Sequence, residues 1–255
     1  MDFNYLELTQ KDDIATLWLN NAKKANCLNE TLWFELGQAI QFIEQKTSNK
    51  VIVLRSKGKH FSSGIDFNFL KSIKEKCSTI DEQDRQAYLH DYILKMQDSF
   101  NQFEATRLPV IAMMHGACIG GAIDLITACD IRFCTVRTAF SIMETKLGIV
   151  ADMGTLQRMR FILSESNLRK LAFTSEVFNG YKAKKFGLVS HCFLSQRAME
   201  RHVYRLAHQL AKLPQDALQG TKQVLNYSRN TSIEQGLAFV AKHNAKALLS
   251  FKLPL

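Results

Sequence analysis

The 255-residue sequence is poor in the residues that mark fibrous and disordered proteins, since it has only 12 glycines and 3 prolines. Hydrophobic residues make up 46% and charged residues 22%, which are ordinary proportions for a globular protein. No segment approaches the roughly 18 consecutive apolar residues that a membrane-spanning helix requires. A chain of this length can bury a large core without disulfides or metal ions. The composition therefore excludes collagen-like, low-complexity and membrane-spanning proteins.

Paired cysteines are also missing, because none of the six cysteines forms a Cys-x-x-Cys motif. The spacing of cysteines and histidines matches no zinc-ligand pattern. Several cysteines lie in apolar runs, as Cys129 does beside Ala128. Such positions are typical of buried, reduced thiols. We therefore expect no disulfide framework and no metal site.

Acidic residues are scarce in the last part of the chain. Residues 155–255 contain 16 Lys and Arg but only 5 Asp and Glu, whereas residues 1–154 contain 17 and 19. A basic segment favours a polyanionic partner, such as a phosphate-bearing molecule, nucleic acid or an acidic membrane surface. A solvated helical surface explains the same charge, so charge alone leaves these alternatives open.

Short apolar runs alternate with helical patterns through the first 150 residues, which predicts an α/β protein. Val51–Leu54 and Val110–Met114 have the continuous apolar character of buried parallel strands. Helices are expected over 29–46 and 84–104, where apolar residues recur at helical spacing. The polar stretch 71–82 predicts a loop.

Beyond residue 153 the pattern is mostly helical, with one strand expected over 187–193. No linker-like stretch separates this part from the rest of the chain. We therefore expect an α/β core at 1–195 with a helical region at 196–255 appended to it.

Three carboxylates lie in apolar settings on neighbouring elements, namely Asp124, Glu144 and Asp152. Burying a lone carboxylate costs several kcal/mol unless it is paired or protonated. Each one alone could cap a helix or pair with an arginine, but together they are typical of tuned acid–base chemistry. Asp130 is expected to be structural and to pair with Arg132.

Two glycines, Gly120 and Gly121, lie where a predicted strand passes into a helix. Backbone N–H groups at a helix N-terminus are free to bind a negatively charged oxygen. The loop Phe61–Asp66 could supply a second N–H group. Two such donors that converge on one oxygen form an oxyanion hole. Most Gly-Gly pairs are simple turns, so this signal is weak by itself.

These segments together resemble the crotonase (enoyl-CoA hydratase/isomerase) superfamily, and the likeness covers essentially the whole chain. The motifs that carry it are Phe61–Asp66 (FSSGID), His115–Arg132 (HGACIGGAIDLITACDIR) and Phe186–Val189 (FGLV). Within the superfamily, Gly148–Arg158 (GIVADMGTLQR) is most similar to the Δ3,5-Δ2,4-dienoyl-CoA isomerases. The resemblance implies a ClpP-like spiral of ββα units with a C-terminal helical trimerisation region.

The resemblance also implies roles for individual residues in fatty acid β-oxidation. Asp152 would be the base at C2 of the acyl chain, and Glu144 would be the acid that delivers a proton at C6. Asp124 would lie behind Glu144 and hold its protonation state through a shared proton or hydrogen bond. The backbone N–H groups of Ser63 and Gly121 would hold the thioester oxygen.

The substrate would be an acyl-CoA, and no separate cofactor is expected because coenzyme A is part of that substrate. A homo-oligomer, either a trimer or a hexamer, is expected as well. The residues that would line the opening for CoA are Ser63, Gly64, Ile65, Asp66, Phe67 and Gly121.

Two other enzymes of the same family are the main alternatives. A 2-enoyl-CoA hydratase typically has Glu at the positions of both Asp124 and Glu144, because both carboxylates bind one water and Asp is one carbon too short. A Δ3,Δ2-enoyl-CoA isomerase needs only the Glu at 144. Some relatives bind RNA through a lysine-rich helix, but here the helix at 29–46 has only Lys46, so nucleic acid is not an expected partner.

The expected location is the cytoplasm. The first residues include Asp2, Glu7 and Asp12 and do not resemble a signal or transit segment. The last residues, Lys252–Leu255, differ from the Ser-Lys-Leu peroxisomal signal.

Overall fold

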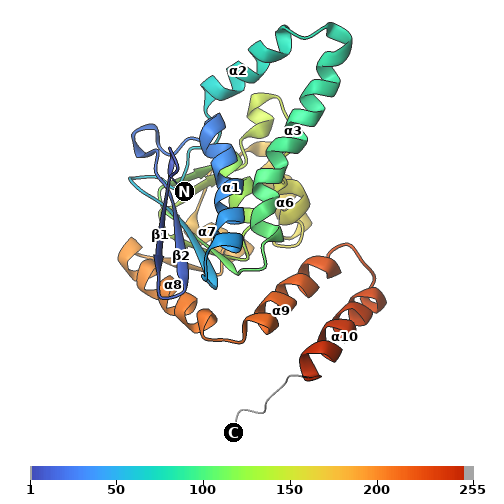
Figure 1. Ribbon diagram of the computed structural model, residues 1–255. Coiled ribbons are helices and arrows are strands. Elements are labelled where there is room, and N and C mark those ends of the chain that lie inside the picture. Colours follow the sequence, from blue (N-terminus) through green and yellow to red (C-terminus); the bar gives the residue numbers. More distant parts are fainter. Residues whose placement is uncertain (1, 250–255) are drawn as a thin grey trace.

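A computed structural model describes residues 2–249, which build a large mixed sheet covered by helices (Figure 1). The sheet has six strands in the order β1-β2-β3-β4-β6-β9. β1 and β2 form an antiparallel hairpin, and every later neighbour is parallel. The strands are β1 (Leu6–Lys11), β2 (Ile14–Leu19), β3 (Val51–Ser56), β4 (Val110–Met114), β6 (Ile131–Thr135) and β9 (His191–Phe193).

A second, three-stranded sheet is built from β5 (Ala117–Ile119), β7 (Ala139–Ser141) and β8 (Phe178–Asn179). The chain enters it from β4 through Gly116, which has a φ of +61°. A Cβ at this position would lie 2.2 Å from the Lys59 carbonyl oxygen, so only glycine fits this turn. The two sheets therefore meet just before the helix that carries Asp124.

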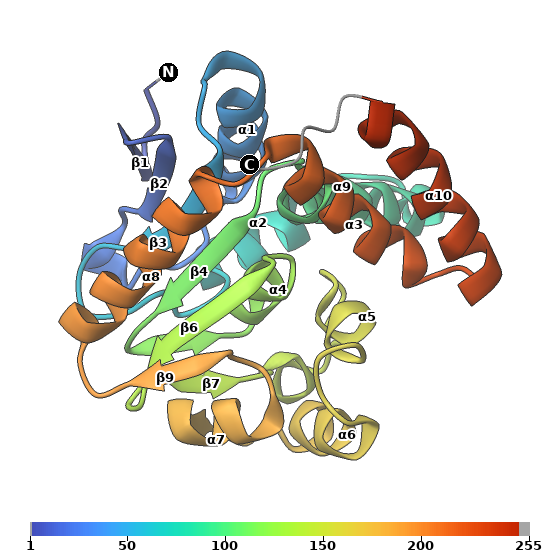
Figure 2. The same ribbon diagram turned by 90° about the horizontal axis from the view of Figure 1, so that it is seen from below.

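The two faces of the large sheet are covered by different helices (Figure 2). Val51 and Val53 of β3 pack towards α8 (Gln196–Ala211), which buries Met199 and Val203. Ile52 and Leu54 alternate to the other face and join the larger core under α1 (Glu30–Lys46), α3 (Glu82–Ala105) and α4 (Gly121–Thr127). The period of two along β3 thus explains why its whole apolar run is buried.

The remaining helices surround this core, and α9 and α10 form a hairpin that projects from the body (Figures 1 and 2). Tyr227 and Phe239 stack across the hairpin with ring centroids 4.3 Å apart. The remaining elements are η1 (Ala22–Lys24), α2 (Phe67–Ser78), η2 (Glu144–Leu147), α5 (Thr155–Met159), α6 (Glu165–Thr174), α7 (Gly180–Phe186), α9 (Gln215–Ser228) and α10 (Ile233–Leu249).

The α/β class is confirmed, but the predicted loop at 71–82 is wrong, because α2 runs through most of it. Asp66 caps this helix, its carboxylate accepting the Asn68 N–H at 2.8 Å. Phe69 and Cys77 are buried on the face that α2 turns to the body. These two residues are eight positions apart, and the charged residues between them hide the buried face from a reading of polarity alone.

The predicted pair of Asp130 and Arg132 is also wrong. Asp130 accepts hydrogen bonds from the Val110 N–H at 2.7 Å and from Lys222 Nζ at 2.9 Å. Arg132 instead donates to backbone carbonyls, including that of Leu188 at 2.8 Å. Lys222 comes from α9, so this partner could not be found from nearby sequence.

The division into 1–195 and 196–255 stays a prediction, and residues 250–255 lie outside the described part. All six cysteines are free. No helix within residues 2–249 is both long and apolar enough to cross a membrane.

Candidate active site

The three predicted carboxylates lie around one cavity, called here the catalytic cavity, with a volume of about 120 Å³. Apolar side chains, such as Trp33, Met96 and Met143, make up much of its wall. The predicted site residues that line it are Ser63, Gly64, Ile65, Phe67, Gly121, Asp124, Glu144 and Asp152. Five separate segments of the chain are therefore brought to one place by the fold.

Asp124 lies in the short helix α4 and is only 2% exposed. Its Oδ1 accepts the Thr155 N–H at 2.8 Å, which ties α4 to the start of α5. Burial, together with the negative charges of Glu144 and Asp152, raises the pKa of Asp124 to about 7. This carboxyl can therefore hold or release a proton near neutral pH.

Glu144 is the first residue of the 3₁₀ helix η2, and two residues separate it from the end of β7. Its Oε2 is buried and has no hydrogen-bond donor among residues 2–249. Burial and the nearby charge of Asp152 raise the pKa of Glu144. An unpaired buried carboxylate oxygen is costly, so burial favours the neutral acid more strongly here than at an exposed glutamate.

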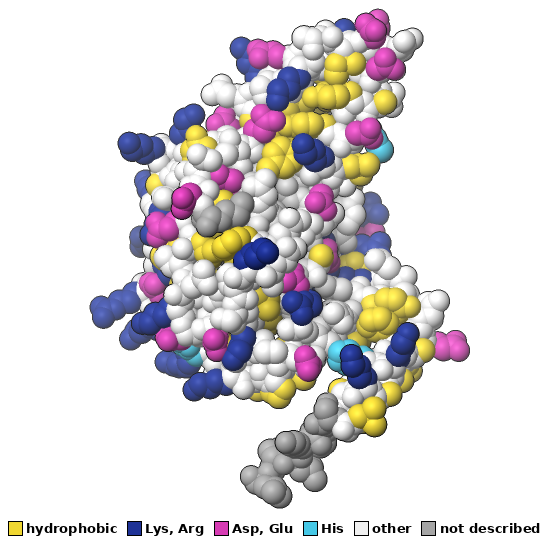
Figure 3. Space-filling model, viewed as in Figure 1, with side chains coloured by type: hydrophobic (Ala, Val, Ile, Leu, Met, Phe, Trp, Pro, Cys, Tyr) yellow, Lys and Arg dark blue, Asp and Glu magenta, His cyan; other side chains and the backbone are white. Residues whose placement is uncertain are grey.

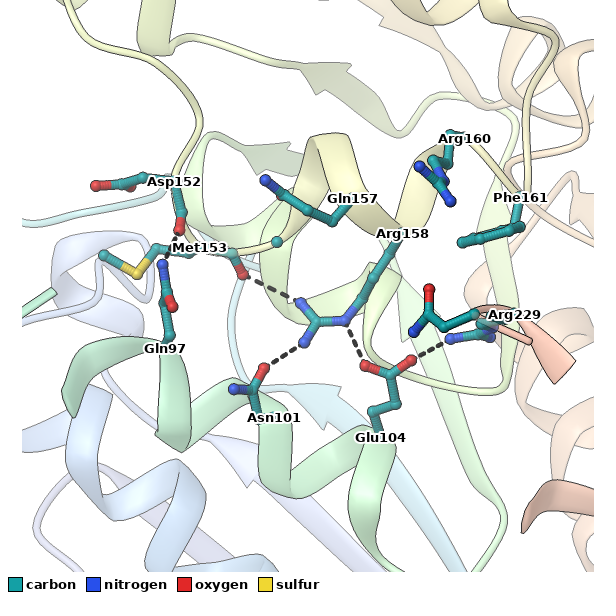
Figure 4. Close-up of a pocket in the computed structure, with 12 residues that line it drawn as sticks. Gln97, Asn101, Glu104, Asp152, Met153, Gln157, Arg158, Arg160, Phe161 and Arg229 are labelled. Atoms are coloured by element: carbon teal, nitrogen blue, oxygen red, sulfur yellow. Dashed lines mark hydrogen bonds and ion pairs between the residues drawn. The ribbon is translucent and has the colours of Figure 1, made fainter. Parts of the chain in front are cut away.

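Asp152 lies on the loop between η2 and α5 and is partly exposed. Its backbone carbonyl accepts the Gln97 side-chain N–H at 2.6 Å, which fixes the loop against α3. In Figure 4 its carboxylate points away from Arg158. Burial raises the pKa of Asp152. Two carboxyls of different exposure thus face the same cavity.

The structure offers two free amides, but one differs from the prediction. Gly121 is the first residue of α4, and its N–H has no acceptor in the described part of the chain. The Ser63 N–H donates to the Ala25 carbonyl at 3.0 Å and is therefore occupied. The Ile65 N–H has no acceptor among residues 2–249. A Cβ built on Gly64 would lie 3.6 Å from Gly121 N, so the two segments are in close contact.

The predicted role of Ser63 as an oxyanion donor is thus contradicted by its hydrogen bond, and Ile65 is the better candidate. Sequence reasoning placed Ile65 in the opening but did not see its amide. Which amide of the loop is free depends on how the loop pairs with residues 25 and 28. That pairing has no local sequence signal.

Asp66 is the one predicted site residue that does not line the catalytic cavity. Besides capping α2, its carboxylate accepts from Cys27 Sγ at 3.4 Å and lies 3.9 Å from Lys24 Nζ. Its contacts are therefore structural. Within residues 2–249 no group of three or more His, Cys, Asp or Glu side chains could hold a metal ion.

Solved structures share this architecture over nearly the full chain. An enoyl-CoA hydratase from Thermoplasma volcanium GSS1 superposes with a TM-score of 0.83 at 24% identity, covering 96% of this chain and 92% of that one. An enoyl-CoA hydratase from Mycobacterium smegmatis gives 0.84 at 20% identity, covering 96% and 91%. These likenesses confirm the predicted crotonase fold.

Curated relatives are more similar in sequence. The peroxisomal Δ3,5-Δ2,4-dienoyl-CoA isomerase of Arabidopsis thaliana is 40% identical over 97% of this chain and 91% of its own length. The mitochondrial Δ3,5-Δ2,4-dienoyl-CoA isomerase of Mus musculus is 36% identical over 97% and 77%. These relatives are named as peroxisomal and mitochondrial proteins, and this finding contradicts the prediction of a cytoplasmic location.

The family model described as enoyl-CoA hydratase/isomerase matches residues 9–248. The match includes both amide segments and all three carboxylates around the catalytic cavity. The chain therefore belongs to the enoyl-CoA hydratase/isomerase family, also called the crotonase family.

Proposed function

We propose that this protein is a Δ3,5-Δ2,4-dienoyl-CoA isomerase of fatty acid β-oxidation, which converts 3,5-dienoyl-CoA to 2,4-dienoyl-CoA. The observation that carries the proposal is that two carboxyls, Glu144 and Asp152, line one apolar cavity beside two free amides. Relatives that are 36–40% identical and bear this name support it. No cofactor beyond the CoA of the substrate is proposed, because the reaction only relocates a proton.

The thioester oxygen would accept hydrogen bonds from the N–H groups of Ile65 and Gly121. These donors would polarise the carbonyl and stabilise the negative charge that develops when a C2 proton leaves. One such donor typically contributes a factor of 10²–10³ to kcat. The apolar wall strengthens the effect, because charges interact more strongly where water is excluded.

Asp152 would take the C2 proton, and Glu144 would deliver a proton at C6. Glu144 is the more isolated of the two, since its Oε2 has no donor to stabilise a negative charge. Asp152 is partly exposed and can remain ionised more easily. The two environments therefore favour an ionised base at 152 and a protonated acid at 144.

Asp124 would act on both groups without contacting the reacting carbons. The structure shows no hydrogen bond between Asp124 and Glu144 among the described residues, so the expected shared proton is not part of the proposal. Asp124 instead holds Thr155, three residues after Asp152, at 2.8 Å. Its role is to position the start of α5 and to add a negative charge, when ionised, behind the cavity.

The experiment that tests the proposal is the Asp152→Asn substitution. The rise in absorbance of the conjugated 2,4-dienoyl-CoA product measures turnover of 3,5-dienoyl-CoA. The variant should lose about 10²–10⁴-fold in kcat, the usual contribution of a general base. Unimpaired turnover would remove Asp152 from the mechanism. Rapid hydration of crotonyl-CoA by the wild-type protein, without dienoyl isomerisation, would favour the hydratase instead.

We also propose that the protein works as a homo-oligomer, either a trimer or a hexamer. The α9–α10 hairpin leaves large apolar side chains exposed, including Leu225 at 63%, Ile233 at 84% and Leu237 at 63% (Figure 3). Apolar surface of this kind on a projecting element is typical of an interface. Light scattering coupled to gel filtration measures the assembly, and a monomer at micromolar concentration would contradict the proposal.

A further inference from the structure

The proposed isomerisation leaves its two acids in exchanged states, and this inference rests on that proposed function. Each turnover puts a proton on Asp152 and removes one from Glu144. Before the next substrate reacts, Asp152 must lose its proton and Glu144 must gain one. The proton could pass directly between the two carboxyls, or it could be exchanged with solvent.

A second cavity, called here the polar cavity, lies on the other side of Asp152 and has a volume of about 400 Å³ (Figure 4). It shares Asp152 and Met153 with the catalytic cavity. Its wall carries amide, carboxylate and guanidinium groups, for example those of Gln157, Glu104 and Arg158. A water molecule needs about 30 Å³ and two to four polar partners, so this cavity suits several hydrogen-bonded waters.

Glu144 has no comparable route. It does not line the polar cavity, and its Oε2 is buried without a partner among residues 2–249. Asp152 is therefore the residue of the reacting pair that lines both the apolar catalytic cavity and the polar one. Because Asp152 also lines the polar cavity, it can contact water there while substrate fills the catalytic cavity.

The wall of the polar cavity is held in place by a hydrogen-bond network on Arg158 (Figure 4). This guanidinium donates to the Met153 carbonyl at 3.1 Å, to Glu104 at 2.8 Å and to Asn101 at 2.5 Å. Glu104 also pairs with Arg229 of α9. These side chains therefore bind one another along the wall of the cavity.

We infer that Asp152 exchanges its proton with solvent through the polar cavity. The O–H bond of Asp152 breaks, and its proton passes to a water of that cavity and on to bulk solvent. Glu144 regains a solvent-derived proton after product leaves. One proton goes out and one comes in during each turnover, so the isomerisation remains balanced. The proton taken from C2 is thus not the one placed at C6.

Deuterium labelling tests this inference. The wild-type enzyme is given 3,5-dienoyl-CoA with two deuterons at C2 in ordinary water, and mass and NMR spectra locate the label in the product. We expect one deuteron kept at C2 and ordinary hydrogen delivered to C6. Deuterium from C2 found at C6 in most product molecules would overturn the inference. Absorbance measures turnover separately, so absence of turnover would count against the proposed function instead.

Gln157 allows the route itself to be tested, because it lines the polar cavity and its side chain makes no hydrogen bond within the described residues. Gln157→Trp should narrow the cavity, lower kcat several-fold with KM unchanged, and increase deuterium transfer from C2 to C6. The exposed Gln41 of α1 gives the matched control, Gln41→Trp, which should behave as wild type. If Gln157→Trp and the smaller change Gln157→Leu both leave kcat and label unchanged, the polar cavity is not the route.

Discussion

Replacing Asp124 by Asn should change how the stability of the protein depends on pH. The carboxyl is 2% exposed, and burial is the largest cause that raises its pKa from 3.8 to about 7. The folded protein therefore binds a proton that the unfolded chain releases between these two pH values. Stability is greatest with the neutral acid and decreases as pH rises through this window.

The size of the effect follows from the shift of about three pKa units, since each unit corresponds to about 1.4 kcal/mol. Ionised Asp124 would thus cost at most about 4 kcal/mol of unfolding free energy above pH 7. Asn has the same shape, and its Oδ1 can still accept the Thr155 N–H. The substitution consequently removes the ionisation and little else.

Urea unfolding of both proteins from pH 4.5 to 8.5 measures the difference. The unfolding free energy of Asp124→Asn should rise relative to that of the wild type as pH rises, by about 3 kcal/mol across this range. Asp98→Asn, at an exposed position of α3 where the partner is the uncharged Gln102, is the matched control and should show no such trend. A difference between Asp124→Asn and wild type that stays constant with pH, or that changes in the opposite direction, would refute the reasoning.

Three further substitutions test the site and its support. Gly64→Ala places a Cβ 2.6 Å from the Ile119 carbonyl oxygen and should lower kcat about 10²-fold by displacing the Ile65 amide. The control is Gly148→Ala, which also has a positive φ but whose Cβ would have no atom within 4 Å. Equal kcat values for the two variants would contradict the prediction. Glu144→Gln should lower kcat by about 10²–10⁴-fold with little change in KM, as measured by the absorbance of the product. A change in KM alone would exclude Glu144 as the acid. Lys222→Met should lower the unfolding free energy by about 3 kcal/mol in urea titrations, because Asp130 loses its buried cationic partner and two backbone carbonyls lose a donor. A loss below about 1 kcal/mol would contradict this.

Much of the fold could be predicted because its signals are local. Asn29 precedes an apolar four-residue repeat, and in the structure its side chain accepts the Leu32 N–H and caps α1. The apolar run at β3 is buried on both faces, as its lack of polar residues indicated. Prediction failed at α2, where charged residues conceal a helix that buries only Phe69 and Cys77.

The candidate site was predicted less completely than the fold. Three carboxylates in apolar surroundings are visible in sequence because burial of a charge is costly wherever it occurs. The occupied amide of Ser63 and the free amide of Ile65 are not visible, since they depend on contacts with residues about 40 positions away in the chain. The true partner of Asp130, Lys222, is 92 residues away.

The sequence alone determined the α/β class, the family likeness and the identity of the acids at 124, 144 and 152, because these follow from patterns of polarity along neighbouring residues. Only the tertiary structure decided which backbone amides are free, which carboxyl is buried without a partner and which acidic residue also lines a second cavity. Those properties depend on contacts between segments that are distant in the sequence, because such contacts decide which groups are hydrogen-bonded and which are exposed to solvent.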